Sequence, residues 1–280
     1  MKELLITLVL LLSFTHICKA QMPVIPQKLN KYIVIDTLKY VITYELNIIN
    51  DIQSPKKTVN DIVVLEIGNT KSKSYSNLLY QADSTAFALS KKGVRNLPLF
   101  QEVVPPVIVY KNYPHSENTV IYRTPLNGPI FKYKEAIPKI NWKLLTEKKI
   151  IMGYSCQKAE TTFRGRTYEA WFTSQIPLKE GPYKFHGLPG LILEISDSQK
   201  HYIFNCIGIQ LANKEEPILY WDWEIQETSR EKLNNLIKRF HEQPANVAQT
   251  LGIRVSFMDS NNNTKDSKTI SYPYNPIELE

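Results

Sequence analysis

Residues 181–195 read Gly-Pro-Tyr-Lys-Phe-His-Gly-Leu-Pro-Gly-Leu-Ile-Leu-Glu-Ile. In this stretch Pro189 suits the second position of a type II turn, and Gly190 suits the third position, which requires a positive φ. The apolar residues that follow, up to Ile195, predict a buried strand. A phosphate-binding loop is disfavoured, because no helix and no Lys-Ser/Thr pair follows the glycines. The predicted signature turn comprises Gly187, Leu188, Pro189, Gly190, Leu191 and Ile192.

Strand signals also dominate the rest of the chain. β-Branched and aromatic residues concentrate in nine segments: 38–46, 61–67, 103–110, 119–123, 153–163, 167–173, 191–195, 202–209 and 218–225. Their number and spacing predict a mainly β (β-rich α+β) protein. We expect one large curved antiparallel sheet, of which a half-barrel would be one form.

Helical patterns are confined to a few places, of which the clearest lies near the C-terminus. Thr228 and Glu231 have the spacing of a capping box. An apolar stripe with helical periodicity follows, formed by Leu233, Leu236, Ile237 and Phe240. A shorter helix is expected over 245–251, ending at Gly252, and a weaker pattern covers 81–92. One or two C-terminal helices should therefore pack on the sheet.

Arg164-Gly165 separates two strand-like segments and suits a two-residue hairpin turn. Such a turn pairs residues whose numbers sum to 329. Glu160 then lies opposite Glu169, and Lys158 lies opposite Trp171, where it could form a cation–π contact. Like charges directly opposite each other destabilise a ladder, so the glutamate pair needs an explanation.

Two interpretations of Glu160 and Glu169 follow. Paired carboxylates can perform acid–base chemistry, which makes a hydrolase the alternative function. The commoner situation is a solvated hairpin face on which the carboxylates are neutralised by a nearby cation, here Arg164, Arg166 or Lys158. We favour the second interpretation.

No other pattern in the sequence predicts catalysis, a metal or a cofactor. The histidines after the first 20 residues are His115, His186, His201 and His241, and none has the spacing of metal ligands. His186 and His201 flank the strand after the signature turn and could approach each other. The chain has no GxSxG motif, and Cys156 lies within a predicted strand with no evident histidine partner. We therefore assign no catalytic residue, metal ligand or cofactor.

Residues 1–20 have the pattern of a secretory signal peptide, with Lys2, an apolar segment over 4–14, and Cys18-Lys19-Ala20 before Gln21. Removal of Lys2, Lys19 and Glu3 lowers the net charge from +7 to +6. We expect cleavage after Ala20, export to the periplasm or the cell surface, and no transmembrane segment in the mature chain.

The mature chain, residues 21–280, is expected to form a single β-rich domain, since it contains no Gly/Ser linker and no repeat. Its basic residues are scattered, which is typical of a solvated surface and argues against nucleic acid as a partner. Cys156 and Cys206 are its two cysteines. In an oxidising compartment they could form a disulfide, or they could be two small buried side chains that never bond.

The chain resembles the GLPGLI family, a group of exported proteins of Gram-negative bacteria. The resemblance rests on the signature at 187–192 and on Trp142 and four further segments: 151–159 (IMGYSCQKA), 163–166 (FRGR), 170–173 (AWFT) and 275–280 (NPIELE). It is densest over about 133–208. The resemblance implies an exported protein without established activity, and it carries no catalytic residues over to this chain.

Aromatic side chains are abundant, with 16 Tyr, 10 Phe and 4 Trp. Most such residues pack in cores, but a strongly curved sheet covered by the helix over 229–240 could also enclose an apolar cavity. The leading hypothesis is a non-enzymatic envelope protein that binds an apolar, lipid-like ligand or a partner protein. The alternatives are the Glu160/Glu169 hydrolase and a structural accessory of an outer-membrane transport assembly.

Overall fold

The computed structural model describes residues 24–94, 104–125, 128–212, 215–252 and 271–280. The predicted leader (1–20) lies outside these ranges. Within them the elements are β1 (Tyr32–Thr37), β2 (Tyr40–Ile48), β3 (Val59–Ile67), β4 (Ser72–Ser76), α1 (Asn77–Lys91), β5 (Val107–Lys111), β6 (Glu117–Arg123), β7 (Ile130–Ala136), β8 (Lys143–Ile151), β9 (Tyr154–Phe163), β10 (Arg166–Thr173), β11 (Leu191–Asp197), β12 (Tyr202–Leu211), β13 (Pro217–Trp221), β14 (Ile225–Glu227), α2 (Arg230–Glu242) and α3 (Pro244–Thr250).

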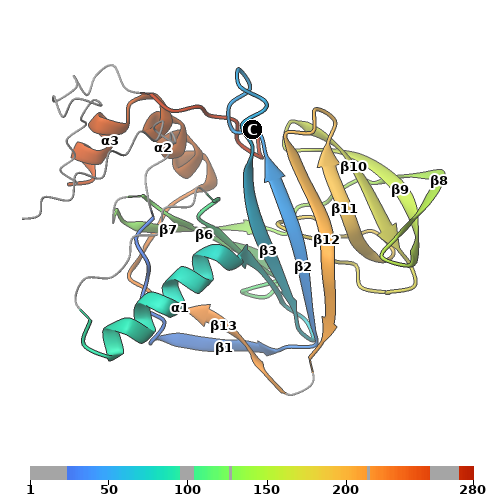
Figure 1. Cartoon of the computed structure of the whole chain (residues 1–280), viewed down its shortest axis with the longest axis horizontal. Helices are drawn as coiled ribbons and strands as arrows, with labels where there is room; N and C mark the ends of the chain where they lie inside the picture. Colours follow the sequence, from blue (N-terminus) through green and yellow to red (C-terminus); the bar gives the residue numbers. More distant parts are fainter. Residues whose placement is uncertain (1–23, 95–103, 126–127, 213–214, 253–270) are drawn as a thin grey trace, which may run out of the picture.

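Twelve of these strands form one sheet in the order β14-β7-β6-β5-β4-β3-β2-β12-β11-β10-β9-β8 (Figure 1). Eleven of them form two meanders, β2 to β7 and β8 to β12, which join where β2 pairs with β12, and β14 is added at the β7 edge. Every neighbouring pair is antiparallel except β14 and β7. β1 and β13 form a separate two-stranded sheet. The predicted β-rich architecture is confirmed.

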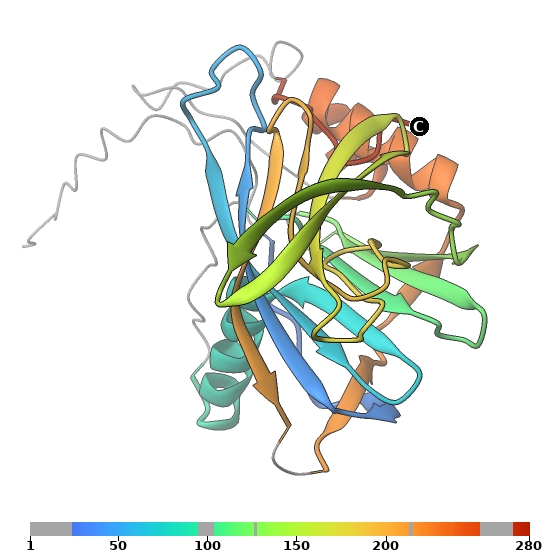
Figure 2. The ribbon, with the colours of Figure 1, turned by 90° about the vertical axis from the view of Figure 1, so that its right-hand side faces the viewer.

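The large sheet is curved and does not close into a barrel. Figure 2 shows the β8–β10 end sweeping across the front of the molecule. The hairpin between β9 and β10 thereby approaches β7, which lies near the opposite end of the strand order, and Arg164 contacts Glu135 at 3.0 Å. The ends of the sheet are therefore linked by side chains rather than by a hydrogen-bonded ladder.

The β9–β10 hairpin has the predicted register. Glu160 pairs with Glu169 and Lys158 pairs with Trp171. Both turn residues, Arg164 and Gly165, have positive φ (50° and 81°), as in a type I′ turn. The predicted cation–π contact of Lys158 is wrong, because that side chain turns towards the carboxylates. The cation over the Trp171 ring is instead Lys149 from β8, 4.5 Å from its centroid.

The signature segment leads into a buried strand as predicted, but the type II turn is wrong. The positive φ (93°) belongs to Gly187 and not to Gly190. Gly190 instead lies against the backbone of Thr173, and a Cβ at that position would be 2.0 Å from the Thr173 carbonyl oxygen. The strand that follows contributes four fully buried side chains to the core: Leu191, Ile192, Leu193 and Ile195.

The two C-terminal helices lie where the sequence predicted them. The N-cap of α2 is Ser229 rather than Thr228, because the Ser229 hydroxyl accepts the Lys232 N–H at 3.2 Å. The apolar stripe of α2 packs against β5, β6 and β7, and Leu233 is buried among Val109, Val120, Tyr122 and Tyr133. α3 ends just before Gly252, whose φ is +75°. None of the helices in the described ranges is long and apolar enough to cross a membrane.

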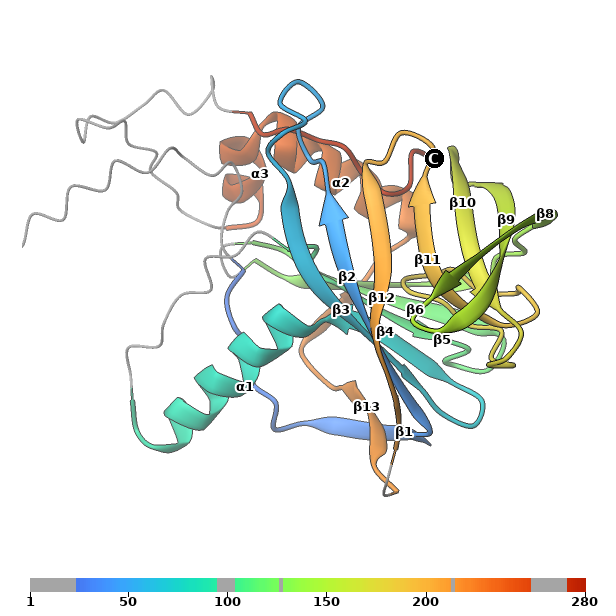
Figure 3. The same ribbon diagram turned by 45° about the vertical axis from the view of Figure 1, so that its right-hand side comes forward.

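α1 begins four residues before the predicted start. Ser76 caps it by accepting the Leu79 N–H at 3.2 Å. Figure 3 shows α1 and the β1–β13 pair at one end of the large sheet, with α2 and the C-terminal residues at the other. The second end holds the candidate site.

Candidate ligand-binding site

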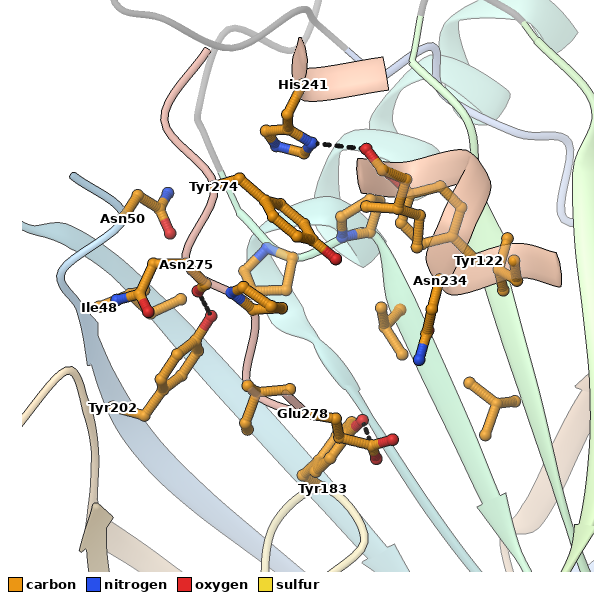
Figure 4. A pocket seen from close by; sticks show the side chains of 18 of the residues that line it. Ile48, Asn50, Tyr122, Tyr183, Tyr202, Asn234, His241, Tyr274, Asn275 and Glu278 are labelled. Atoms are coloured by element: carbon orange, nitrogen blue, oxygen red, sulfur yellow. Dashed lines mark hydrogen bonds between the residues drawn. The ribbon is translucent and has the colours of Figure 1, made fainter. Parts of the chain in front are cut away.

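A mainly apolar cavity of about 160 Å³ lies between the large sheet, α2 and the C-terminal residues (Figure 4). β5 and β6 supply one wall and α2 supplies another, with Val107, Val120, Tyr122, Leu233 and Ile237. Polar groups occur around it on Asn50, Asn234, His241, Tyr274 and Asn275. An apolar space with a few polar groups is the usual form of a small-molecule site.

The remaining wall of this cavity is the segment 273–278, which runs in an extended form across the sheet. Its backbone carbonyls are held by side chains. Tyr202 donates to the carbonyl of Asn275 at 2.6 Å, and Tyr168 donates to that of Ile277 at 2.9 Å. Arg166 donates to the carbonyl of Pro276. The wall is therefore fixed by specific hydrogen bonds.

Arg166 is itself held in place, since it is buried and pairs with buried Asp197 at 3.1 Å. It also donates to the side chain of Asn275, whose amide reaches the carbonyl of Ile49 at 2.6 Å. Charge-assisted bonds of this kind are stronger than neutral ones. The segment thus connects β10, β11 and the end of β2.

A buried charge cluster lies where this segment ends. Lys184 has no solvent exposure and contacts Glu135 at 2.7 Å and Glu278 at 2.6 Å. Arg164 and Arg230 also contact these carboxylates. Burial alone would lower the pKa of Lys184, but Tyr133 and the two carboxylates reverse this effect and raise it. Lys184 therefore stays a cation, and its two ion pairs join β7 to the C-terminal segment.

The pKa of Glu278 is lowered, which favours the ionised form of Glu278 just as the raised pKa of Lys184 favours the ionised lysine. Burial would raise it, but the charge and hydrogen bond of Lys184 outweigh burial and hold the pKa below its usual range. Tyr183 also donates to Glu278 at 2.7 Å, as Figure 4 shows. Glu278 therefore lacks the raised pKa expected of a general acid at neutral pH.

A second cavity of about 100 Å³ adjoins the first, and both are lined by Pro105, Val107, Tyr183, Tyr202 and Ile277. Apolar side chains make up most of its lining, and the polar residues there are Asp61, Ser74, Ser76 and three tyrosines. Asp61 is 2% exposed. Its Oδ1 accepts hydrogen bonds from the Ser76 hydroxyl (2.8 Å) and the Ile62 N–H (2.7 Å). Its Oδ2 is buried and has no hydrogen-bond partner in the described part of the chain.

Burial raises the pKa of Asp61 to about 7, and the two hydrogen bonds oppose that shift only in part. Sequence reasoning missed this residue. A signal was available, because Asp61 alternates with Val63, Leu65 and Ile67 and therefore faces the buried side of β3.

Glu160 and Glu169 lie apart from both cavities, whose linings contain neither residue. Lys158 lies between the carboxylates, 3.8 Å from Glu160 and 3.2 Å from Glu169, and Lys200 is 3.7 Å from Glu169. Partial burial acts to raise the pKa of Glu169, but Lys158 and Lys200 outweigh it and lower the pKa. The prediction that a neighbouring lysine neutralises the pair is confirmed.

The histidines do not come together. His186 hydrogen-bonds the carbonyl of Pro138 at 2.9 Å, whereas His201 faces Arg166. His241 lines the larger cavity, hydrogen-bonds the carbonyl of Ile237, and has a pKa lowered by burial. The described residues contain no group of three or more His, Cys, Asp or Glu side chains placed to hold a metal ion.

The structure contains no bond between Cys156 and Cys206, and both are free buried thiols. They lie on β9 and β12, which are separated by β10 and β11. The predicted disulfide is therefore absent from this structure, which agrees with the interpretation of two small buried side chains.

The signature residues from Gly187 to Ile192 line neither cavity. Ile192 contributes its carbonyl to the buried hydroxyl of Tyr44 at 2.7 Å, and Leu188 is buried in the main core. Their observed contacts are those of the core.

Residues 114–215 match a family model, PNGase_F-II_N, described as the N-terminal domain of N-glycanase peptide. Two solved structures of PNGF-II, in the P21 and C2 space groups, are similar to the chain with TM-scores of 0.47 and 0.46, each at 17% identity. The alignments cover 71% and 73% of this chain but only 32% and 33% of PNGF-II, about a third of its length. No curated protein sequence matches the chain.

Proposed function

We propose that this protein is an exported, non-catalytic binding protein whose concave sheet holds a small apolar ligand beside α2 and the C-terminal segment. The observation that carries the proposal is the cavity of about 160 Å³ with its adjoining cavity of about 100 Å³. An apolar cavity of about 150 Å³ in another protein holds benzene. The ligand, or the part of it that enters, is therefore the size of one ring or a short alkyl chain.

Two further observations support binding over the alternatives. The hydrolase hypothesis depended on Glu160 and Glu169, which Lys158 neutralises on a surface away from the cavities. The family match concerns an N-terminal domain of N-glycanase peptide, which is compatible with a module that accompanies other activities. Export remains part of the proposal and rests on the leader pattern of residues 1–20. Membership of the GLPGLI family stays a prediction.

The proposal is tested by titrating the purified mature protein with toluene and observing the methyl resonances of Val107, Val120 and Leu233. We expect shifts at these methyls that saturate with toluene concentration. Val120→Phe should abolish them, because Val120 is buried and the larger side chain would fill the cavity. Val34→Phe is the matched control, since Val34 lies on β1 and is 58% exposed.

Unshifted methyls in a folded wild-type protein at saturating toluene would contradict the proposal. A pull-down from envelope extract distinguishes the remaining hypothesis. A stoichiometric protein partner whose binding is unaffected by Val120→Phe, with no toluene binding, would favour the accessory of an outer-membrane assembly.

A further inference from the structure

The two oxygens of the Asp61 carboxyl have different surroundings. Oδ1 connects β3 to α1, because the Ser76 hydroxyl that donates to it also caps the helix. That structural role accounts for one oxygen only. Oδ2 is buried and unpartnered among the described residues, and Asp61 is on the lining of the smaller cavity. Burying an unpaired carboxylate oxygen is costly, so its position calls for a partner.

Among the described residues that line this cavity there is no lysine, arginine or histidine. The titratable neighbours of Asp61 there are Tyr75 of β4, Tyr202 of β12 and Tyr183 of the segment before β11. Each hydroxyl is already engaged, donating to Glu66, to the carbonyl of Asn275 and to Glu278 respectively. The other lining residues are serines, Pro105 and apolar side chains from β2, β3, β5, β12 and the C-terminal segment.

Building on the proposed function, we propose that the ligand carries one primary amine, which enters the smaller cavity as an ammonium group and pairs with Oδ2 of Asp61. The apolar part of the same ligand then extends into the adjoining larger cavity, since the two share lining residues. The ligand class is thus a small apolar amine. An ammonium–carboxylate hydrogen bond in a dry site is among the stronger polar contacts available.

The protonation of Asp61 gives this ligand class a distinctive pH dependence. With a pKa of about 7 in the empty cavity, the carboxyl is mostly neutral at pH 5.5 and mostly ionised at pH 8.5. The neighbouring tyrosines stay neutral over that range, because burial raises the pKa values of Tyr75, Tyr183 and Tyr202. An alkylammonium remains protonated at pH 8.5. Amine binding should therefore strengthen as pH rises, and binding of a neutral analogue should not.

The test compares benzylamine with benzyl alcohol, which have nearly the same shape, in calorimetric titrations of the wild-type protein at pH 5.5 and 8.5. We expect benzylamine to bind at least about tenfold more tightly at pH 8.5 than at pH 5.5, the two pH values lying on either side of the pKa of Asp61. Benzyl alcohol should change less than about twofold. Asp61→Asn should abolish the pH dependence while retaining benzyl alcohol, and Asp222→Asn, at an exposed aspartate, should behave as wild type.

The outcomes separate this inference from the proposed function. Equal affinities for benzylamine at both pH values, together with toluene and benzyl alcohol binding, would overturn the amine proposal and leave the apolar cavity intact. If neither toluene nor the two benzyl compounds bind, both proposals fail. The wild-type comparison decides the matter even if Asp61→Asn does not fold.

Discussion

Gly187 and Gly190 are three residues apart in the signature and meet different steric requirements. Gly187 has a φ of 93°, and the nearest atom to an added Cβ would be 3.9 Å away. Gly190 lacks a positive φ, but its Cβ would overlap the Thr173 carbonyl and approach Ser174 N to 2.9 Å. A backbone cannot move aside as easily as a flexible side chain, so the second requirement is the stricter one.

The residue-scale prediction follows from that difference. Gly187→Ala should lower the free energy of unfolding by about 1–2 kcal/mol, the cost of a left-handed conformation for a residue with a Cβ. Gly190→Ala should cost more, upwards of about 3 kcal/mol, because β10 and the start of β11 must separate. Urea unfolding of both variants measures this. Equal stability of Gly190→Ala and wild type would show that the contact with Thr173 is not required.

At the scale of elements, α2 shows how a cap can be displaced by one residue. Thr228 and Ser229 are both suitable N-cap residues, and Thr228 has the capping-box spacing to Glu231. In the structure the Thr228 N–H is used in a bond to the Lys132 carbonyl beside β14, and the Ser229 hydroxyl caps the helix instead. The pairing of β14 with β7 thus determines where the helix begins.

Ser229→Ala should therefore destabilise the protein by about 1 kcal/mol, through loss of the cap. Thr228→Ala is the matched control and should cost clearly less, since its backbone bond survives the substitution. Thermal unfolding of the two variants beside wild type makes the comparison. A larger loss of stability in Thr228→Ala than in Ser229→Ala would indicate that Thr228 is the N-cap.

A strand can be predicted from the sequence where its residues have an apolar or β-branched pattern, and it is missed where they are polar or charged. β9 and β10 were predicted with their register, because Arg164-Gly165 demands a tight turn between two strongly patterned segments. β4 and β8 were missed, since Ser72–Ser76 is polar and Lys143–Ile151 is rich in charge. β4 is nevertheless buried, and its Lys73 is accommodated by Glu66 and the ring of Tyr75. The sequence does not show that Glu66 and Tyr75 lie beside Lys73, so the burial of this lysine could not be predicted from it.

The sequence predicted an apolar cavity beneath a helix, but it did not predict the residues that line the cavity. A cavity under the helix over 229–240 follows from a curved sheet with an amphipathic helix. Its composition does not follow, because the lining joins the ends of β2 and β12 with β5, β6, α2 and the segment 273–278. The role of Arg166 in holding that segment depends on residues more than a hundred positions away.

At the scale of the whole molecule, the buried cluster around Lys184 links the two ends of the open sheet by side-chain contacts. It joins Glu135 of β7 to Glu278 of the C-terminal segment, and both carboxylates contact arginines from the β9–β10 turn and from α2. Removing this fully buried lysine takes away the cation that the two carboxylates share and leaves them only their contacts with the arginines. Its effect on stability should therefore exceed that of any surface ion pair.

Lys184→Met should lower the free energy of unfolding by about 3–5 kcal/mol, the typical cost of breaking a buried ion pair on one side. Lys200→Met provides the control, because the Lys200 side chain is 52% exposed and its pair with Glu169 is 3.7 Å long. That variant should differ from wild type by less than about 1 kcal/mol. Guanidinium unfolding at neutral pH compares the two variants. Similar losses in the free energy of unfolding would show that Lys184 contributes no more to stability than a surface lysine.

The unclosed sheet also has a consequence for contacts between copies of the chain. β8 is its last strand on one side, and its backbone could in principle recruit a strand from a second molecule. Two features oppose this. The pairing of β8 with β9 is irregular between Leu144 and Lys148, and Lys143, Glu147 and Lys148 are exposed along the strand. Irregular, charged edges are poor templates for strand addition, so these features of β8 act against edge-to-edge pairing of two copies of the chain.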